Sequence, residues 1–389
     1  MKNQLFQKFN EIFGEGENIE LYFSPGRVNL IGEHTDYNGG HVFPCALTIG
    51  TYGAVRKNNS NTLRFYSMNY DQLGIITSNS EDIKYSKEDD WANYPKAVFW
   101  AIKEKGYKTP QGLDILYYGN IPNQSGLSSS ASIEVLTGYI IKSICGLDFD
   151  MIELAQLCKT AENQFIGVNC GIMDQFAIAM GKKDHGVFLD TNTLEYEYAP
   201  VILGHKKIII ANTNRKRELS DSKYNERREE CESALFDLQK IVDIQSLGDL
   251  KELEFEEIKH FIQNPVCRIR AKHAVYENQR TVLAVTALKN HNLSLFGQLM
   301  KESHISLRDD YQVSCKELDT LVEAAWEQEG VIGSRMTGAG FGGCTVSIVD
   351  QEQVDSFINN VGKIYEDKIG YKADFYVVDI GSGPCKIDE

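Results

Sequence analysis

The chain has 389 residues, of which 42% are hydrophobic and 24% are charged, and its formal net charge is −15. This length exceeds the size at which a single core usually keeps growing, so we expect two packed domains with a cleft between them. The acidic balance and the lack of a Lys/Arg-dense face argue against a nucleic-acid partner, so an anionic ligand must be held by local donors.

The cysteines and histidines indicate in which cellular compartment the protein works and whether it binds zinc. The nine cysteines are scattered and include no CxxC pair, so we expect reduced thiols. Residues 1–16 show no signal-peptide core, and nowhere do about 18 apolar residues run together. The eight histidines show neither HExxH nor zinc spacing. We therefore expect a cytoplasmic protein with no membrane partner, in which a metal arrives with the substrate.

The first part of the chain is predicted to begin with strands and to change to helices. Short β-rich runs at 47–50 and 63–67 lie between Gly and Asn turns, and 113–118 has the composition of another strand. From Ser130 onward the apolar positions follow helical spacing, and a second apolar stripe marks a helix over 154–165.

After residue 181 the chain alternates strands with long charged helices. Strands are predicted near 187 and at 207–211, 344–349 and 375–378, and helices at 221–242, 271–288 and 316–328. The chain is therefore predicted to be α+β, without internal repeats. We expect an N-terminal domain over 1–180 and a C-terminal domain over 181–389.

Residues 122–132 form a Pro/Gly/Ser-rich loop between the strand at 113–118 and the helix that follows. Unpaired N–H groups of a first helical turn and the positive end of the helix dipole suit phosphate oxygens. Gly126 removes a side chain where a ligand must come close. The alternative is that serine is here simply a good helix N-cap.

A second glycine cluster at 337–343 formally satisfies GxGxxG, which would indicate a dinucleotide-binding fold. Such a fingerprint must open a helix, whereas 344–349 is β-branched and is predicted to be a strand. We therefore expect a tight turn pressed near a ligand, or only a hairpin between strands. A Walker A sequence and the protein-kinase signatures are absent.

The third cluster, at 24–40, is dense in polar side chains between glycines. Glu33, His34 and Asp36 stand within four positions, and such groups can bind vicinal hydroxyls of a sugar. The alternative is a solvated turn.

Four motifs, in this order, resemble the signatures of the GHMP family of small-molecule kinases, and the first resembles that of galactokinases. They are GRVNLIGEHTDYNGG (26–40), GLSSSAS (126–132), GVNCGIMDQF (167–176) and GSRMTGAGFGGC (333–344). Further likeness lies in RAKHAVYENQRT (270–281) and SHISLRDDYQVS (303–314), so the resemblance spans nearly the whole chain.

The resemblance implies a two-domain GHMP kinase architecture, with an N-terminal domain like the second domain of ribosomal protein S5 and a C-terminal ferredoxin-like domain. It implies phosphorylation of α-D-galactose at the anomeric hydroxyl by ATP and Mg²⁺, giving galactose 1-phosphate, in an enzyme expected to be a monomer. Alternatives are a kinase for a related sugar such as N-acetylgalactosamine, or a non-catalytic galactose and ATP sensor. The intact pair Ser130 and Ala131 favours catalysis.

The resemblance also implies the roles of individual residues. Asp174 and Arg27 match the catalytic pair, and whether Asp174 acts as base or electrostatic stabiliser stays open. The matches to sugar contacts are Glu33, His34, Asp36, Gly171, Asp174 and Tyr224. Backbone N–H groups for the phosphates are expected from Gly126, Leu127, Ser128, Ser129 and Ser130, and Mg²⁺ ligands from Ser130 and Glu162.

The phosphate loop departs from the family pattern at one place. Many relatives carry two or three glycines before the serines, whereas here Gln124 and Ser125 precede a single Gly126. We expect phosphate binding to survive, with nucleotide affinity as the parameter affected.

Overall fold

The fold is that of a computed structural model, in which residues 1–121, 126–215 and 220–387 are described. The helices are α1 (Lys2–Phe13), α2 (Asn93–Glu104), α3 (Ser129–Cys145), α4 (Met151–Thr160), α5 (Met173–Ala179), α6 (Ser220–Leu238), α7 (Glu252–Ile258), α8 (Pro265–Lys289), α9 (Leu293–Asp309), α10 (Lys316–Trp326) and α11 (Val354–Ile369). The strands are β1 (Glu20–Asn29), β2 (His41–Val42), β3 (Pro44–Lys57), β4 (Thr62–Ser67), β5 (Ile76–Asn79), β6 (Leu113–Gly119), β7 (His185–Asp190), β8 (Tyr196–Pro200), β9 (Lys206–Asn212), β10 (Val331–Thr337), β11 (Cys344–Asp350), β12 (Asp374–Val378) and β13 (Cys385–Ile387).

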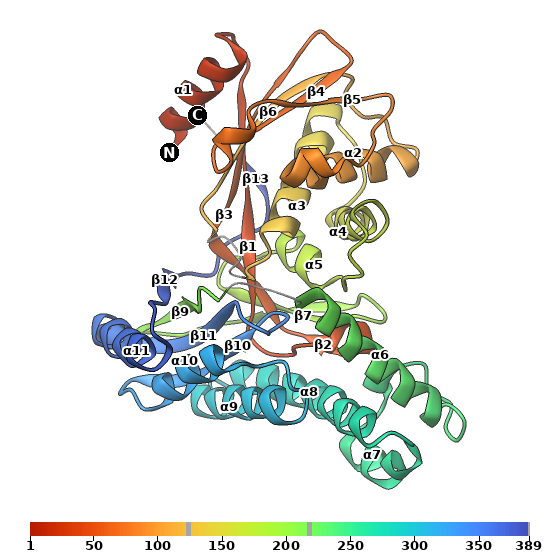
Figure 1. The fold of residues 1–389 in the computed structure, drawn as a ribbon, viewed down its shortest axis with the longest axis vertical. Coiled ribbons are helices and arrows are strands. Elements are labelled where there is room, and N and C mark those ends of the chain that lie inside the picture. Colours follow the sequence, from red (N-terminus) through yellow and green to blue (C-terminus); the bar gives the residue numbers. More distant parts are fainter. Residues whose placement is uncertain (122–125, 216–219, 388–389) are drawn as a thin grey trace.

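The upper part of the molecule is a six-stranded sheet in the order β13-β1-β3-β6-β4-β5 (Figure 1). Its neighbours are antiparallel except β4 and β6, which are parallel. Helices α2 to α5 cover one face, where the largest hydrophobic core forms. Helix α1 covers the other face with Leu5, Phe9 and Phe13. This sheet therefore carries α3 and α5, whose first turns border the site described below.

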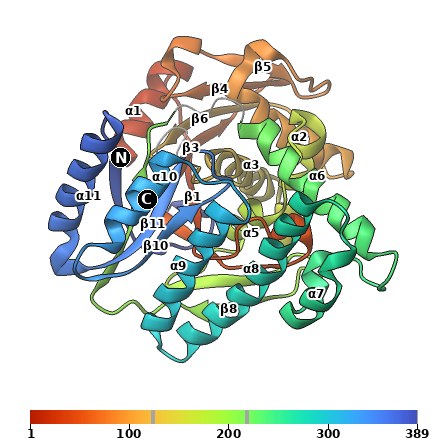
Figure 2. The ribbon, with the colours of Figure 1, turned by 60° about the horizontal axis from the view of Figure 1, so that its bottom comes forward.

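The lower part is a four-stranded antiparallel sheet in the order β10-β11-β9-β12. Ile208 and Ile210 of β9 point into one core, and Ile209 and Ala211 point into another. This alternation is the two-residue period of a strand buried on both faces. One core is closed by α10 and α11, and the other by α8 and α9, which Figure 2 shows in front of the sheet.

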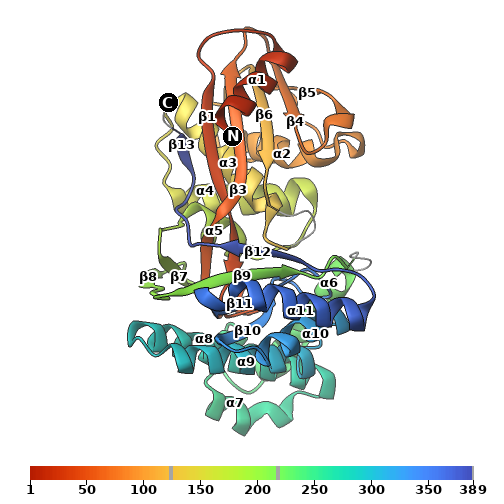
Figure 3. The ribbon, with the colours of Figure 1, turned by 90° about the vertical axis from the view of Figure 1, so that its left-hand side faces the viewer.

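The two parts are joined by long strands as well as by packing. Figure 3 shows β1 and β3 running from the upper sheet down to the lower one, with β13 returning alongside β1. Val28, near the end of β1, and Leu30, just after it, share a core with Phe296 and Met300 of α9. The expected division between residues 180 and 181 stays a prediction.

The α+β class is confirmed, and most predicted elements are present. The predicted helix at 154–165 is α4 followed by a π-helical turn, Ala161–Ile166, which ends at Gly167 with a φ of 88°. The glycine cluster connects the antiparallel strands β10 and β11, so it opens no helix, as expected. Gln124 and Ser125 lie outside the described residues. No helix in the described part of the chain is long and apolar enough to cross a membrane.

Candidate active site

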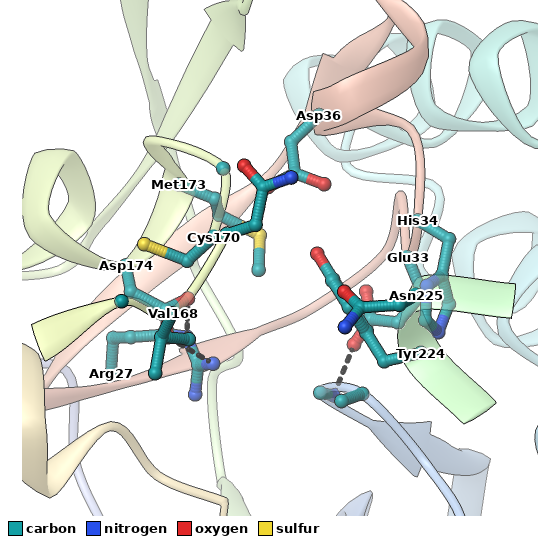
Figure 4. A pocket seen from close by; sticks show the side chains of 15 residues that line it. Arg27, Glu33, His34, Asp36, Val168, Cys170, Met173, Asp174, Tyr224 and Asn225 are labelled. Carbon is teal, nitrogen blue, oxygen red and sulfur yellow. Dashed lines mark hydrogen bonds and ion pairs between the residues drawn. The ribbon is translucent and has the colours of Figure 1, made fainter. Parts of the chain in front are cut away.

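A cavity of about 310 Å³ lies where loops of the upper and lower parts meet (Figure 4). Its lining combines the polar turn after β1, the 167–174 segment, the start of α6 and the turn after β10. The lining residues are Arg27, Glu33, His34, Asp36, Gly167, Val168, Asn169, Cys170, Gly171, Met173, Asp174, Tyr224, Asn225, Gly338 and Ala339. The predicted catalytic pair and every predicted sugar contact thus border one cavity, although they come from three distant segments.

Arg27 and Asp174 form a two-pronged ion pair at the floor of this cavity. Arg27 lies on β1 just after a β-bulge, and Asp174 lies in the first turn of α5. Arg27 Nε donates to Asp174 Oδ1 at 2.7 Å, and Arg27 Nη2 donates to Oδ2 at 2.8 Å. Arg27 is only 4% exposed, and its remaining nitrogen Nη1 donates to the carbonyl of Gly126 at 2.7 Å. Arg27 therefore ties the carboxylate of Asp174 to the predicted phosphate loop.

The predicted phosphate residues lie beside the cavity, outside its lining. Helix α3 begins at Ser129, and Ser128 occupies the N-cap with a φ of 59°. The Ser128 hydroxyl forms no cap hydrogen bond to the helix and donates to Asp174 Oδ2 instead, so Ser128 is an N-cap by position only. The N-terminus of α3 is thereby held next to the Arg27 and Asp174 pair.

Acidic side chains collect on the same side of the cavity; we call Glu134, Glu162, Asp36 and Asp174 the acidic group. Gln175 Nε2 donates to Glu162 Oε2 at 2.6 Å and to Glu134 Oε2 at 3.2 Å. Burial raises the pKa of Glu162 to about 7 and that of Asp36 to about 6, with Asp174 adding to both shifts. Burial also raises the pKa of Glu134 well above its ordinary value. The protein thus holds these carboxyls where their charge is poorly solvated.

The acidic group offers carboxylate oxygens for Mg²⁺. No cluster of three or more His, Cys, Asp or Glu that could hold a metal by itself occurs among residues 1–121, 126–215 and 220–387. Mg²⁺ usually takes one or two carboxylates together with substrate phosphates and waters, so a complete protein cage is not required. The Ser130 hydroxyl forms a hydrogen bond with Glu162, and Oε1 of Glu134 is buried without a hydrogen-bond partner among the described residues. These hard oxygen donors fit Mg²⁺, while the neighbouring N-terminus of α3 suits the phosphates that would accompany it.

The opposite wall contains a second set of buried charges, which we call the alternating group: Glu33, Arg335, Glu277 and Arg280. Glu33 accepts the N–H of Gly338 at 2.7 Å and lies 3.3 Å from Arg335 Nη1. Arg335 is fully buried on β10. Burial would raise the pKa of Glu277, but Arg280, His273 and Arg335 together hold it at about 2. Each of these charges therefore has an opposite charge beside it.

Glu277 also connects this wall to the polar turn. It accepts the N–H of Gly32 at 3.1 Å and the hydroxyl of Ser303 at 2.5 Å. Glu33 and His34 are 1% and 5% exposed, so the alternative of a solvated turn is wrong.

Gly171 illustrates why the segment before α5 is rich in small residues. A Cβ at this position would lie 1.8 Å from Oδ2 of Asp36. Glycine is therefore required for the close approach of the 167–174 segment to the polar turn. The other lining residues were not among the predicted site residues. Seven of them stand within the motifs at 167–176 and 333–344, and the eighth, Asn225, follows Tyr224 directly.

Known protein families match three parts of the chain. The galactokinase galactose-binding signature matches residues 7–57, the N-terminal domain of GHMP kinases matches 93–182, and the GHMP kinase C-terminal domain matches 284–367. The galactokinase of Clostridium acetobutylicum is 60% identical over 387 residues, which is 99% of each chain. The galactokinase of Bacillus subtilis is 57% identical over 383 residues, 98% of each chain. The chain belongs to the galactokinases of the GHMP kinase family.

Solved structures agree with this membership of the galactokinase family. The crystal structure of Lactococcus lactis galactokinase complexed with galactose matches with a TM-score of 0.97 and 47% identity, covering 99% of this chain and 100% of that one. Methanococcus jannaschii mevalonate kinase, at 17% identity and a TM-score of 0.68, shares the fold. The predicted GHMP kinase architecture is therefore confirmed.

Proposed function

We propose that this enzyme transfers the terminal phosphate of ATP to the anomeric hydroxyl of α-D-galactose, giving ADP and galactose 1-phosphate. The observation that carries this assignment is the Arg27 and Asp174 pair, which lies in a polar cavity of sugar size and also contacts the phosphate loop through Gly126 and Ser128. Galactose would occupy the cavity, and the phosphates of ATP would lie at the N-terminus of α3. Phosphoryl transfer requires mainly this kind of positioning and charge stabilisation.

Asp174 and Arg27 are the proposed catalytic residues. Asp174 would accept a hydrogen bond from the anomeric hydroxyl and take or stabilise its proton as the oxygen attacks phosphorus. Arg27 would stabilise negative charge on that oxygen and on the transferring phosphoryl group. Because Arg27 and Ser128 already fix both carboxylate oxygens of Asp174, the carboxylate is oriented before substrate binds.

The remaining roles follow the two walls of the cavity. Glu33, His34, Asp36, Gly171 and Tyr224 would position the sugar. The backbone N–H groups of Gly126, Leu127, Ser128, Ser129 and Ser130 would hold the phosphates. Ser130 and Glu162 would hold Mg²⁺, which when bound with ATP neutralises phosphate charge. Glu134 and Gln175 would keep Glu162 aimed at that place.

We also propose that the enzyme is cytoplasmic and monomeric. All nine cysteines are free thiols, which fits a reducing compartment. Sedimentation at micromolar concentration checks the oligomeric state.

A sugar panel tests the function directly. The enzyme is incubated with ATP, Mg²⁺ and galactose, glucose, arabinose or N-acetylgalactosamine, ADP is measured, and phosphorus NMR locates the new phosphate. We expect turnover with galactose and a phosphate on its anomeric oxygen. No turnover with galactose, or faster turnover with another sugar, would contradict the proposal.

A further inference from the structure

A line of buried polar groups leads from α6 to the sugar side of the cavity. Cys231 Sγ lies 3.2 Å from the hydroxyl of Tyr311, which lies 2.8 Å from the hydroxyl of Tyr37. The Tyr37 hydroxyl in turn lies 2.8 Å from Nδ1 of His34. We call these four residues the hydroxyl relay. It joins three elements distant in sequence and ends at a ring that lines the cavity.

Ring packing holds the relay in this geometry. Tyr311 is fully buried, and the centroid of its ring lies 4.9 Å from that of His34 and 4.5 Å from that of His273. The ring of Tyr224 lies 5.7 Å from that of His34 on the cavity side, and Figure 4 shows both residues on the same wall as Glu33. His34 itself has a φ of 63°, in the left-handed region that a side chain rarely adopts. The imidazole therefore has little freedom to turn.

The members of the relay are uncharged near neutral pH. Burial lowers the pKa of His34 to about 3 and raises the pKa values of Tyr37 and Tyr311 well above their ordinary value. Burial also raises the pKa of Cys231 to about 12. A neutral imidazole has one N–H, so one ring nitrogen of His34 donates and the other accepts. The hydrogen bond at Nδ1 decides which of the two nitrogens carries the proton.

We propose that Tyr37 donates its hydroxyl proton to Nδ1 of His34, so that Nε2 carries the N–H and donates it to a hydroxyl oxygen of the sugar. This inference deepens the proposed function and rests on it. Tyr37 and Tyr311 are thereby positioning residues, because they act on the substrate through His34. In this direction Tyr311 donates to Tyr37, and the thiol of Cys231 donates weakly to Tyr311.

The surroundings of His34 decide between the two possible directions of the hydrogen bonds in the relay. Glu33, Asp36 and Asp174 line the same cavity, so acceptors for sugar hydroxyls are plentiful and a donor is needed. Nε2 of His34 is buried and makes no hydrogen bond to another residue in the described part of the chain, so a sugar hydroxyl in the cavity could become its partner. If the hydrogen bonds ran in the opposite direction, Nε2 of His34 would be one more acceptor beside the carboxylates. The last acceptor of the relay would then be the sulfur of Cys231, which accepts hydrogen bonds only weakly.

The tautomer is measured by nitrogen NMR on ligand-free enzyme labelled with ¹⁵N-histidine, with His34→Gln used to assign the signals. We expect His34 to carry its proton on Nε2, and Tyr37→Phe to shift this signal toward the other tautomer. A proton on Nδ1 in the unsubstituted enzyme would overturn the proposal. This measurement needs no turnover, so it stands even where galactose phosphorylation fails.

Kinetics test whether the tautomer matters for the sugar. We expect Tyr37→Phe to raise the KM for galactose about 10-fold, with kcat and the KM for ATP changing less than about 2-fold, and Tyr311→Phe to act in the same direction more weakly. Tyr365→Phe is the matched control, because its buried hydroxyl donates to the carbonyl of Thr213, outside the relay. Equal rises in both KM values, or the same rise in the control, would indicate a merely structural role and overturn the proposal.

KM values for deoxygalactoses, each lacking one hydroxyl, identify the sugar hydroxyl that His34 contacts. For the analogue that lacks the hydroxyl bound by His34, Tyr37→Phe and the unsubstituted enzyme should have nearly equal KM values. A 10-fold ratio that persists for every analogue would show that His34 does not act through a sugar hydroxyl.

Discussion

The two walls of the cavity both bury charge, but they neutralise it differently. In the alternating group, Arg280, Glu277, Arg335 and Glu33 follow one another with opposite signs, and Glu277 remains strongly acidic with a pKa of about 2. In the acidic group, the pKa values of Glu162, Asp36 and Glu134 all rise. In the alternating group each carboxylate has an arginine beside it, although burial still raises the pKa of Glu33. In the acidic group only Asp174 has such a partner, Arg27, and no ion pair joins Glu162, Glu134 or Asp36 to another described residue.

This difference assigns a task to each wall. A buried carboxylate with a neighbouring cation keeps its charge and its direction, as binding of a neutral sugar requires. A buried carboxylate without such a neighbour is costly unless it is protonated or joined by a cation. Glu162 and Glu134 of the acidic group therefore suit Mg²⁺ with ATP, whose binding would supply the positive charge that they lack.

Removing the charge of the Asp174 carboxylate should have the largest effect. We predict that Asp174→Asn lowers kcat by about 10²–10⁴-fold, while calorimetry shows galactose binding nearly unchanged. The exposed Asp367→Asn is the control and should be fully active. Full activity of Asp174→Asn would remove the catalytic role of this residue.

Breaking the alternating group should cost stability. Arg335→Met leaves Glu33 and Glu277 buried without their shared cation, so we predict a loss of about 3–5 kcal/mol in the free energy of unfolding, measured with urea. Arg308→Met removes an arginine that pairs with Asp309 and Glu323 at the surface, and should cost at most about 1 kcal/mol. Equal losses in the two variants would contradict the contrast between the walls.

The same kind of change in the acidic group should have a different outcome. We predict that Glu162→Gln raises the Mg²⁺ concentration for half-maximal activity about 10–100-fold, with no loss of stability in the ligand-free enzyme, because it removes a poorly solvated charge. Binding of Mn²⁺ with ATP, followed by electron paramagnetic resonance, gives a second readout. Glu366→Gln at the surface is the control. An unchanged metal requirement would place the metal elsewhere.

The raised pKa values also predict a pH dependence, which should be the smallest of these effects. Glu162 keeps its proton in the native state up to about pH 7, whereas the unfolded chain releases it near the ordinary value of 4.5. The native state thus binds more protons, so stability is greater below this window and falls as pH rises through it. We predict a loss of about 1–2 kcal/mol between pH 6 and pH 8 for ligand-free enzyme.

Glu162→Gln tests the origin of this slope. The variant lacks the titrating carboxyl and should show a flatter profile, whereas Glu366→Gln should keep the original slope. Rising stability over the same range would show that the acidic group does not govern the titration.

Sequence patterns predicted those helices and strands whose buried positions are occupied by apolar residues. Strand β11, with six buried positions in seven, was marked by its β-branched run, and α3 by its apolar spacing. Helix α9 was not predicted, because its buried face includes Ser303, His304 and Ser306. Their partners on α8 and β10 are distant in sequence, so no local pattern shows that these polar residues are internal.

The site shows the same limit. The motifs contain most of the cavity residues, because each motif places several polar or charged residues in a short run. Glu134 was passed over, although it lies one helical turn after Ser130, because a glutamate in a helix is ordinarily exposed. Its burial depends on Glu162 and Gln175, which only the folded chain brings beside it.

A crystal structure with galactose, Mg²⁺ and a non-hydrolysable ATP analogue tests the division between the walls most directly. We predict Mg²⁺ about 2.0–2.1 Å from a Glu162 oxygen and the Ser130 hydroxyl, the phosphates on α3, and galactose against Glu33 and His34 with its anomeric oxygen at Asp174. Mg²⁺ held without Glu162, or galactose bound away from the alternating group, would contradict this assignment.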